Sequence, residues 1–307
     1  MTKVVSSPVR HTRISMFDIV NITLLLLLTL LVAYPIYYTV IASLSDSQAV
    51  ATGRVSLLPV GFQTTAYRAV FENKQIWTGY LNTILYTLGG TAFNLFLTIP
   101  AAYAMSKKRM LGHQLLTWYF LITMYFGGGM IPTYLLNKSL GLVNNPMIMV
   151  ISGGLSVYNM IVTRTYYQNS IPESLYEAGR IDGSSELGIF FRIALPLSLP
   201  IIAVMCLYYA VGHWNGYFTA LIYLTKTKYQ PLALVLRRIL IMNESALDEA
   251  VGADLDPSLI ANAAARANLV VVMKYALVLI ASLPMLILYP FIQKYFVKGI
   301  MIGSVKG

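Results

Sequence analysis

The sequence has very little charge for its length. Asp, Glu, Lys and Arg together make up 11% of the 307 residues, whereas a soluble domain has about 25%. Hydrophobic residues reach 57%, so a water-exposed surface of this size could not stay wetted. The composition excludes a soluble enzyme, a disordered regulator and a nucleic-acid-binding domain. The formal net charge of +10 therefore indicates orientation in a membrane rather than affinity for phosphates.

Cysteine and histidine are also scarce. The single cysteine, Cys206, excludes an internal disulfide framework and a thiolate metal cluster. The three histidines, His11, His113 and His213, lie far apart in the sequence and lack the spacing of metal ligands. We therefore expect no metal site in the chain.

Long apolar runs are what the sequence has in abundance. A hydrocarbon core about 30 Å thick needs about 20 apolar residues in a helix. Six runs of roughly this length are present: residues 17–44, 80–105, 114–136, 146–162, 199–224 and 269–296. The first run is nearly twice as long as the apolar part of a signal peptide, so we interpret it as a retained anchor. The sequence predicts an all-α integral membrane protein with six transmembrane helices.

Positive charge predicts how these helices are oriented. The short loop at residues 106–112 contains Lys107, Lys108 and Arg109 and gives the strongest signal. Because Lys and Arg in short loops favour the cytoplasmic side, both termini are expected in the cytoplasm.

The long polar stretch between the fourth and fifth runs, about residues 165–198, predicts a helix, a sharp turn and another helix. Ser170 is expected to cap the first helix, and Gly183 suits the residue just past its end. Ser184 or Ser185 is expected to cap the second helix, which Pro196 should stop. With both termini inside, this loop faces the cytoplasm.

The same stretch carries a family resemblance. Glu177-Ala178-Gly179, Gly183 and the later Ile193-x-Leu195-Pro196 stand at the spacing of the EAA loop, so the chain resembles the permeases of ABC importers. Gly179 stands where Ala is usual, which exchanges one small residue for another. The pair Asp182-Gly183 and the continuation Phe191…Leu195-Pro196-Leu197 are similar to the carbohydrate branch of maltose-permease type. More narrowly, the segments 128–134, 213–215 with 230–232, and 296–307 resemble LplC-type oligosaccharide permeases.

The resemblance implies a type I importer permease, a single domain over residues 1–307, in the bacterial cytoplasmic membrane. The sequence has no phosphate-binding Gly-x-x-x-x-Gly-Lys-Ser/Thr loop, so ATP hydrolysis must come from a partner. The implied partners are two ATPase subunits that hold ATP and Mg, a second homologous permease and an extracytoplasmic solute-binding protein. This chain itself is expected to bind no cofactor.

The resemblance also assigns roles within the loop. Small residues would let the ATPase approach, Glu177 and Asp182 would pair with its basic groups, and apolar residues would pack. The expected coupling residues are Leu175, Tyr176, Glu177, Ala178, Gly179, Asp182, Gly183 and Phe190.

Polar residues inside the apolar runs are the candidates for a substrate path, because such groups are costly in lipid unless they are paired or wetted. Flat rings and amide groups suit a sugar, whose C–H faces stack while its hydroxyls form hydrogen bonds. Helix anchoring at the membrane surface or between helices is the competing explanation. The candidates are Tyr208, Tyr209, His213, Trp214, Asn215, Tyr217, Asn82, Tyr86 and Tyr125, with Asn94 beside them.

Two further segments leave alternatives open. The outer loop at about residues 225–268 is either a structured lid that meets the solute-binding protein or a solvated loop. The C-terminal tail at 296–307 either reaches the ATPase pair or is frayed.

A secondary transporter would need inverted repeats and buried carboxylates, and a membrane enzyme would need a catalytic constellation at one depth; the sequence has neither. An ABC permease for a non-sugar solute is the serious alternative. The charges of the outer loops are too balanced to indicate an acidic sugar.

Overall fold

The computed structural model describes residues 15–107, 109–239, 241 and 257–301. Within these ranges the regular elements are all helical. In chain order they are α1 (Met16–Ser43), α2 (Ser47–Ala51), α3 (Thr65–Glu72), α4 (Lys74–Ser106), α5 (His113–Tyr125), α6 (Met130–Ser139), α7 (Met147–Ile151), α8 (Val157–Asn169), α9 (Glu173–Ile181), α10 (Glu186–Ile189), the π-helical turn η1 (Phe190–Ala194), α11 (Leu195–Leu197), α12 (Leu199–Trp214), α13 (Tyr217–Tyr223), the 3-10 turn η2 (Thr227–Tyr229) and α15 (Pro257–Met301).

Three helical segments are long and apolar enough to cross a membrane: Met16–Ser43, Lys74–Ser106 and Ala264–Ile287. Two pairs of helices have a suitable composition but are sharply bent, by 110° between α5 and α6 and by 77° between 186–197 and α12. The described residues therefore hold three candidate spans, or five if each bent pair is one span. The first, second and sixth expected runs fall within α1, α4 and α15, and the total of six stays a prediction.

The third, fourth and fifth expected runs are not continuous helices. The third is bent by 110° between α5, which ends at Tyr125, and α6, which begins at Met130. α7 ends at Ile151 and α8 begins at Val157, after a turn in which Gly153 has a φ of +68°. The fifth run breaks at Asn215 and Gly216, between α12 and α13. The apolar composition of a run indicates that it can lie within the membrane, but it does not indicate whether the helix is continuous. Backbone groups freed at such breaks need partners from the protein itself.

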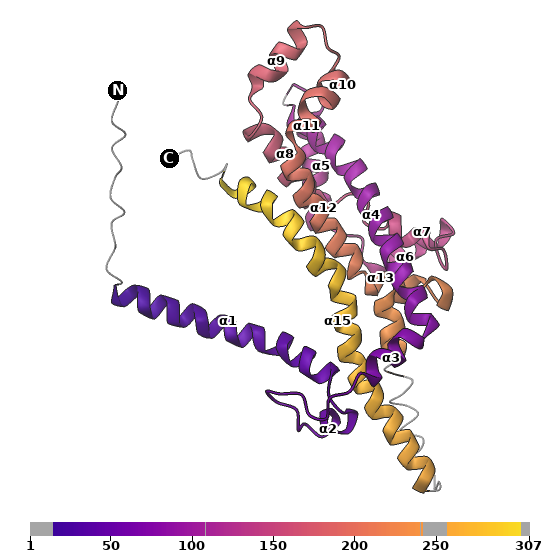
Figure 1. Cartoon of the computed structure of the whole chain (residues 1–307). Coiled ribbons are helices and arrows are strands. Elements are labelled where there is room, and N and C mark those ends of the chain that lie inside the picture. The colour runs from indigo at the N-terminus through magenta and orange to yellow at the C-terminus, as the bar shows by residue number, and fades with distance from the viewer. Residues whose placement is uncertain (1–14, 108, 240, 242–256, 302–307) are drawn as a thin grey trace.

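The helices α4, α8 and α12 pack side by side, and α15 lies against α12 (Figure 1). Small residues on α4 allow this close approach. An added Cβ at Gly90 of α4 would overlap the ring of His213 on α12. α4 is thus the central helix of the packed bundle, with one end at the loop that carries α9.

Helix α1 projects from this bundle (Figure 1). Only Ile41, Ala42 and Ser43 at its C-terminal end are buried, where the helix meets α15. The 18-residue apolar window of α1 is 0% buried. A surface this apolar is stable only in lipid or against another protein, which agrees with a membrane-embedded chain.

Candidate functional site

The loop at residues 170–198 has the predicted form of two short helices joined by a sharp turn. α9 follows Pro172, and Gly183 adopts a φ of +75° just past its end, a conformation in which glycine is favoured. Ser185 then caps α10, because its hydroxyl accepts a hydrogen bond from the amide of Gly188 at 3.2 Å.

Two local expectations for this loop were wrong. Ser170 does not cap α9; it ends α8, and its amide donates to the Tyr166 carbonyl. Pro196 does not stop the second helix, which passes through η1 and α11 and bends only at Ser198. Pro196 lies in α11, directly after the π-helical turn at Phe190–Ala194.

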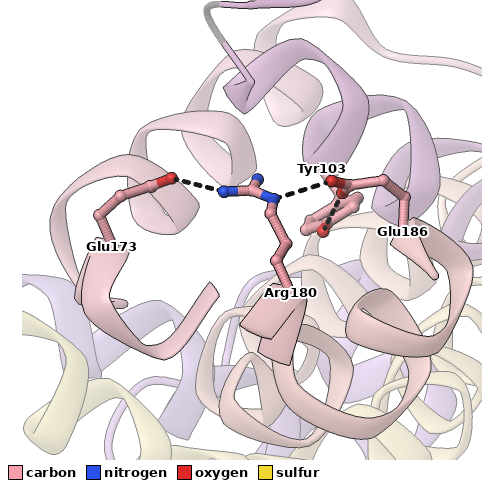
Figure 2. A network of polar contacts seen from close by, with 4 residues as sticks. All are labelled: Tyr103, Glu173, Arg180 and Glu186. Carbon is pink, nitrogen blue, oxygen red and sulfur yellow. Dashed lines mark hydrogen bonds and ion pairs between the residues drawn. The ribbon is translucent and has the colours of Figure 1, made fainter. Parts of the chain in front are cut away.

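A network of ion pairs and hydrogen bonds links α9, α10 and the end of α4 (Figure 2). The Arg180 guanidinium lies 3.6 Å from a Glu173 oxygen through Nη1 and donates to Glu186 at 3.1 Å through Nε. The second oxygen of Glu186 accepts from the Tyr103 hydroxyl, at the end of α4, at 3.5 Å. The hydrogen bond to Glu186 raises the pKa of Arg180. Because these carboxylates are exposed, the network orients α9 relative to α10 but contributes little to the stability of the fold.

Lys107 provides a second link between α4 and the loop. Its ammonium lies 3.1 Å from the centroid of the Tyr176 ring on α9 and 4.9 Å from that of Tyr103. Partial burial lowers the pKa of Lys107, and the two ring faces partly replace the lost water. The Tyr103 ring also contacts the rings of Tyr167 and Phe190. The loop is therefore fastened to the end of a membrane-spanning helix.

The expected coupling residues divide into an exposed and a buried set. Leu175, Glu177, Ala178, Asp182 and Gly183 are exposed and available to a partner. The other three are buried against the rest of this chain; they are Tyr176, Gly179 and Phe190. The exposed face also carries two large apolar residues that sequence reasoning missed, Ile181 and Leu187.

The residues that attach the loop to α4 were also not predicted from the sequence. Tyr103 and Lys107 stand four residues apart at the end of α4, so they share one helix face, and this spacing was a usable signal for a cation beside a ring. Lys107 was considered only for membrane orientation. The pairing of Arg180 with Glu186 depends on the turn at Gly183, which brings α10 back beside α9.

Two buried tyrosines allow a sharp comparison of stability. The hydroxyl of Tyr176 is buried with no hydrogen-bond partner among the described residues, and burial raises its pKa. The hydroxyl of Tyr167 donates to Ser198 at 3.1 Å. We expect Tyr176→Phe to leave thermal stability unchanged or to raise it by up to about 1 kcal/mol, and Tyr167→Phe to cost about 1 kcal/mol. Thermal unfolding of the purified variants checks this, and equal losses would contradict it.

A polar cavity of about 220 Å³ lies between α4, α12 and the break that separates α7 from α8. Three expected path residues, Tyr208, Tyr209 and His213, line it together with Asn94. The half-exposed ring of Tyr208 and the small polar groups around it can bind a polyhydroxylated molecule by stacking and hydrogen bonding.

A hydrogen-bond network forms the wall of this cavity. The Asn94 amide donates to the carbonyls of Gly153 and Gly154 at 3.0 and 2.8 Å, which satisfies backbone groups freed by the helix break. Its oxygen therefore faces His213, whose Nε2 lies at 2.5 Å and is the donor. The Tyr209 hydroxyl lies 2.6 Å from that of Thr98. The network joins α4, α12 and the turn between α7 and α8.

Two other expected path residues do not line the cavity and instead connect α4 to another segment through hydrogen bonds. The Asn82 amide donates to the carbonyls of Lys228 and Gln230 at 2.9 and 3.0 Å. The Tyr86 hydroxyl donates to the Tyr229 carbonyl at 2.8 Å. Both residues thus hold the segment after α13 against α4.

The remaining four candidates are similarly placed away from the cavity. The Trp214 indole donates to the Ala281 carbonyl of α15 at 3.1 Å, and Asn215 donates to its own helix. Tyr217 is hydrogen-bonded to Arg237. Tyr125, next to the bend between α5 and α6, is exposed.

The part of the chain that the structure describes holds no group of three or more His, Cys, Asp or Glu side chains able to bind a metal. Much of the expected lid, residues 242–256, and the end of the tail, residues 302–307, lie outside the described residues.

Comparison with protein families decides the broad assignment. The family described as the inner membrane component of binding-protein-dependent transport systems matches residues 76–302. The chain belongs to this family. The matched residues include both the loop with α9 and the polar cavity, and the N-terminal helix α1 lies before them.

Individual relatives cover nearly the whole chain. A Bacillus subtilis (strain 168) permease protein of a polygalacturonan/rhamnogalacturonan transport system, YtcP, is 37% identical over 95% of this chain and 99% of its own length. Protein LplC of the same organism is 38% identical over 95% of both chains. A solved chain of a bacterial ABC transporter involved in the import of the acidic polysaccharide alginate is 34% identical, covers 94% of this chain and all of its own, and superimposes with a TM-score of 0.79. That solved chain therefore shares the fold seen here.

Proposed function

We propose that the chain is the membrane-spanning permease subunit of an ATP-driven oligosaccharide importer and forms half of its translocation path. The position of α9, at the end of α4, is the observation that supports this proposal most strongly. This helix is fastened to the end of a membrane-spanning helix, and its exposed side presents Leu175, Glu177 and Ala178 to a partner. An element held in this way can pass the movement of a bound ATPase to the membrane helices.

The coupling works through differential contacts. An ATPase subunit that grips α9 changes the equilibrium of the permease only if its contacts differ between two states. Lys107 and Tyr103 carry a displacement of α9 to α4, and α4 carries Asn94 in the wall of the polar cavity. Movement of the loop, about residues 165–198, would therefore be transmitted through α4 to the cavity.

The complete importer is proposed to contain a second homologous permease, two ATPase subunits that hold ATP and Mg, and an extracytoplasmic solute-binding protein. The chain would form a single permease domain over residues 1–307 with six spans and both termini in the cytoplasm of a bacterium. The outer loop at about residues 225–268 would meet the solute-binding protein. This chain would bind no nucleotide itself.

The cargo is proposed to be an oligosaccharide. Support comes from the polar cavity, where the Tyr208 ring lies beside hydrogen-bonding groups. Further support comes from the names of relatives, which refer to polygalacturonan, rhamnogalacturonan and alginate. The alternative is an ABC permease for a non-sugar solute, which competition by amino acids and ions against a labelled oligosaccharide would reveal.

The test is reconstitution in vesicles. We expect labelled oligosaccharide to accumulate only when the two permeases, the ATPase subunits, the solute-binding protein and ATP are all present. Accumulation by the chain alone, or by a proton gradient without ATP, would overturn the proposal. Neutral and uronic-acid oligosaccharides offered in parallel would identify the class of sugar.

Gly183 gives a more specific test of the loop. An added Cβ there would meet no atom of this chain within 4 Å, so within the permease a substitution acts through the positive φ. Asparagine tolerates this conformation, whereas a β-branched residue does not. We expect Gly183→Asn to retain most uptake and Gly183→Val to lower it by about fivefold to thirtyfold through strain of about 1–2 kcal/mol. The protein should stay inserted in both cases, and equal uptake by both variants would contradict the role of the turn.

A further inference from the structure

The wall of the polar cavity contains no formal charge. Residues of α4, α7, α12, α13 and the turn after α7 line it, and within the described part of the chain none of them is Asp, Glu, Lys or Arg. The helices α7, α12 and α13 have none of these residue types along their whole length. α4 has only Lys74, which lies about 30 Å along the helix from Asn94. Arg164, on α8, lies beside His113 and is not part of the lining.

Three hydroxyl groups in the lining are free to bind a ligand. The side chains of Ser152, Tyr208 and Thr219 form no hydrogen bond with the described residues. The other polar side chains of the lining are already joined in the network between α4, α12 and the turn after α7. Because a hydroxyl can both donate and accept, three of them can match the hydroxyl groups of a sugar.

The end of α12 makes the cavity unfavourable for an anion. Gly212 and His213 line the cavity and belong to the last turn of α12, which ends at Trp214. The C-terminal end of a helix carries a partial negative charge. A carboxylate placed here would lose water, meet this negative end and find no Lys or Arg, a combination that strongly disfavours the charged form. An uncharged hydroxymethyl group loses less hydration and can bind the free hydroxyls.

We propose that the polar cavity is a subsite for one uncharged sugar unit and that it disfavours a unit that carries a carboxylate. Ser152, Tyr208 and Thr219 are the residues that determine this specificity. The inference rests on the proposed function, because it assumes that the cavity belongs to the path of an oligosaccharide. It also goes further, because it gives this half of the path a charge selectivity. If the cargo carries carboxylates, another subunit must recognise them.

Thiol reagents of different charge test the electrostatics of the cavity without knowledge of the cargo. Ser152→Cys and Thr219→Cys are made separately in a Cys206→Ser background, because Cys206 is the single cysteine of the chain. The purified assembly of permeases and ATPase subunits is treated at pH 8, where a histidine of ordinary pKa, about 6.5, is neutral. The reagents are uncharged 2-hydroxyethyl methanethiosulfonate and anionic 2-sulfonatoethyl methanethiosulfonate, and mass spectrometry of this chain measures both rates.

We expect both cysteine variants to prefer the uncharged reagent. The preference should exceed that of free 2-mercaptoethanol by at least about tenfold, which corresponds to about 1.4 kcal/mol. Thr64→Cys is the matched control, because Thr64 is exposed before α3 and its side chain forms no capping hydrogen bond. This control should show no such preference.

Two trisaccharides of the same linkage test the subsite itself. Galactotriose is uncharged, and trigalacturonate carries a carboxylate in place of each hydroxymethyl group. Galactotriose should slow the labelling of Ser152→Cys by the uncharged reagent, and trigalacturonate should need at least about a tenfold higher concentration for the same protection. Tyr208→Phe keeps the ring and should weaken protection by galactotriose by about threefold to tenfold, through loss of one hydrogen bond. Tyr158→Phe changes an exposed tyrosine outside the lining and should have no effect.

Four outcomes would overturn the proposal. The first is reaction of the anionic reagent at both positions as fast as that of the uncharged one, relative to 2-mercaptoethanol. The second is failure of both reagents to reach either position, which would show that the cavity is closed. The third is protection by trigalacturonate equal to that by galactotriose, or no protection by either. The fourth is an equal effect of Tyr208→Phe and Tyr158→Phe. Failure of vesicle uptake by the wild-type assembly would instead count against the proposed function.

Discussion

Replacing Gly179 by leucine is expected to abolish uptake while leaving the protein in the membrane. Gly179 lies on the buried side of α9, where an added Cβ would be 2.9 Å from Cδ1 of Ile193 and 3.2 Å from Cγ1 of Ile189. The further carbons of leucine would have to enter this packed contact. Overpacking of this kind costs about 1–3 kcal/mol, more than an exposed short helix can absorb without moving.

The displacement would break the fastening of the loop. Tyr176 and Arg180 flank Gly179 on α9, and they carry the contacts with Lys107 and Glu186. If α9 moves away from η1, these contacts lengthen together, and an ATPase bound to α9 no longer moves α4. We expect uptake to fall by at least about tenfold, which corresponds to a loss of about 1.4 kcal/mol of coupling. Uptake of labelled oligosaccharide by vesicles measures the change.

Gly179→Ala is the matched control. The atom nearest to the added Cβ is Cδ1 at the end of the Ile193 side chain, and a small rotation of this side chain can move it by a few tenths of an ångström. Alanine is also the usual residue at this place in the EAA loops that the sequence resembles. We expect this variant to retain uptake. Full uptake by Gly179→Leu, or loss of the leucine variant from the membrane, would refute the explanation.

How much of the fold the sequence predicts depends on the range of the interaction. The helices α1 and α4 follow from apolar runs, and the turn at Gly183 and the cap at Ser185 follow from the preferences of single residues. Each of these features is decided by neighbours in the chain, so local patterns are sufficient to predict it.

The rest depends on contacts between distant residues. Asn94 and His213 are 119 residues apart, and Tyr103 and Glu186 are 83 residues apart. No local pattern indicates that Asn94 binds the carbonyls of a helix break, because the break itself was not predicted. Burial of Tyr176 and Gly179 was missed for the same reason. An amphipathic helix has a buried side, but its sequence does not say whether a partner or the same chain covers it.

The second large effect is expected at Gly90 of α4, which packs against His213 in the wall of the polar cavity. An added Cβ at Gly90 would overlap the imidazole ring of His213. Gly90→Ala must therefore displace His213 and break its hydrogen bond with Asn94. We expect a loss of about 1–3 kcal/mol in stability and a fall in uptake of at least about tenfold, because the wall of the cavity is rearranged. Thermal unfolding and vesicle uptake measure the two effects.

Gly89→Ala is the matched control for the same substitution one residue away. An added Cβ at Gly89 would meet Val150 at 3.5 Å, an ordinary contact. Because alanine favours the helix over glycine by about 0.5–1 kcal/mol, this variant should be as stable as the wild type or slightly more stable. Similar losses in both variants would show that α4 is sensitive to any added side chain, and that His213 is not the cause.

A double variant tests whether His213 transmits the effect. His213→Ala removes the ring that Gly90→Ala would displace, so the second substitution should cost little once the first is present. The two changes should then be strongly non-additive, with an interaction of about 1–3 kcal/mol, as expected for residues in contact. Because Asn94 still donates to the carbonyls of Gly153 and Gly154 in the double variant, the helix break should remain in place. Additive losses would show that Gly90 acts through another residue.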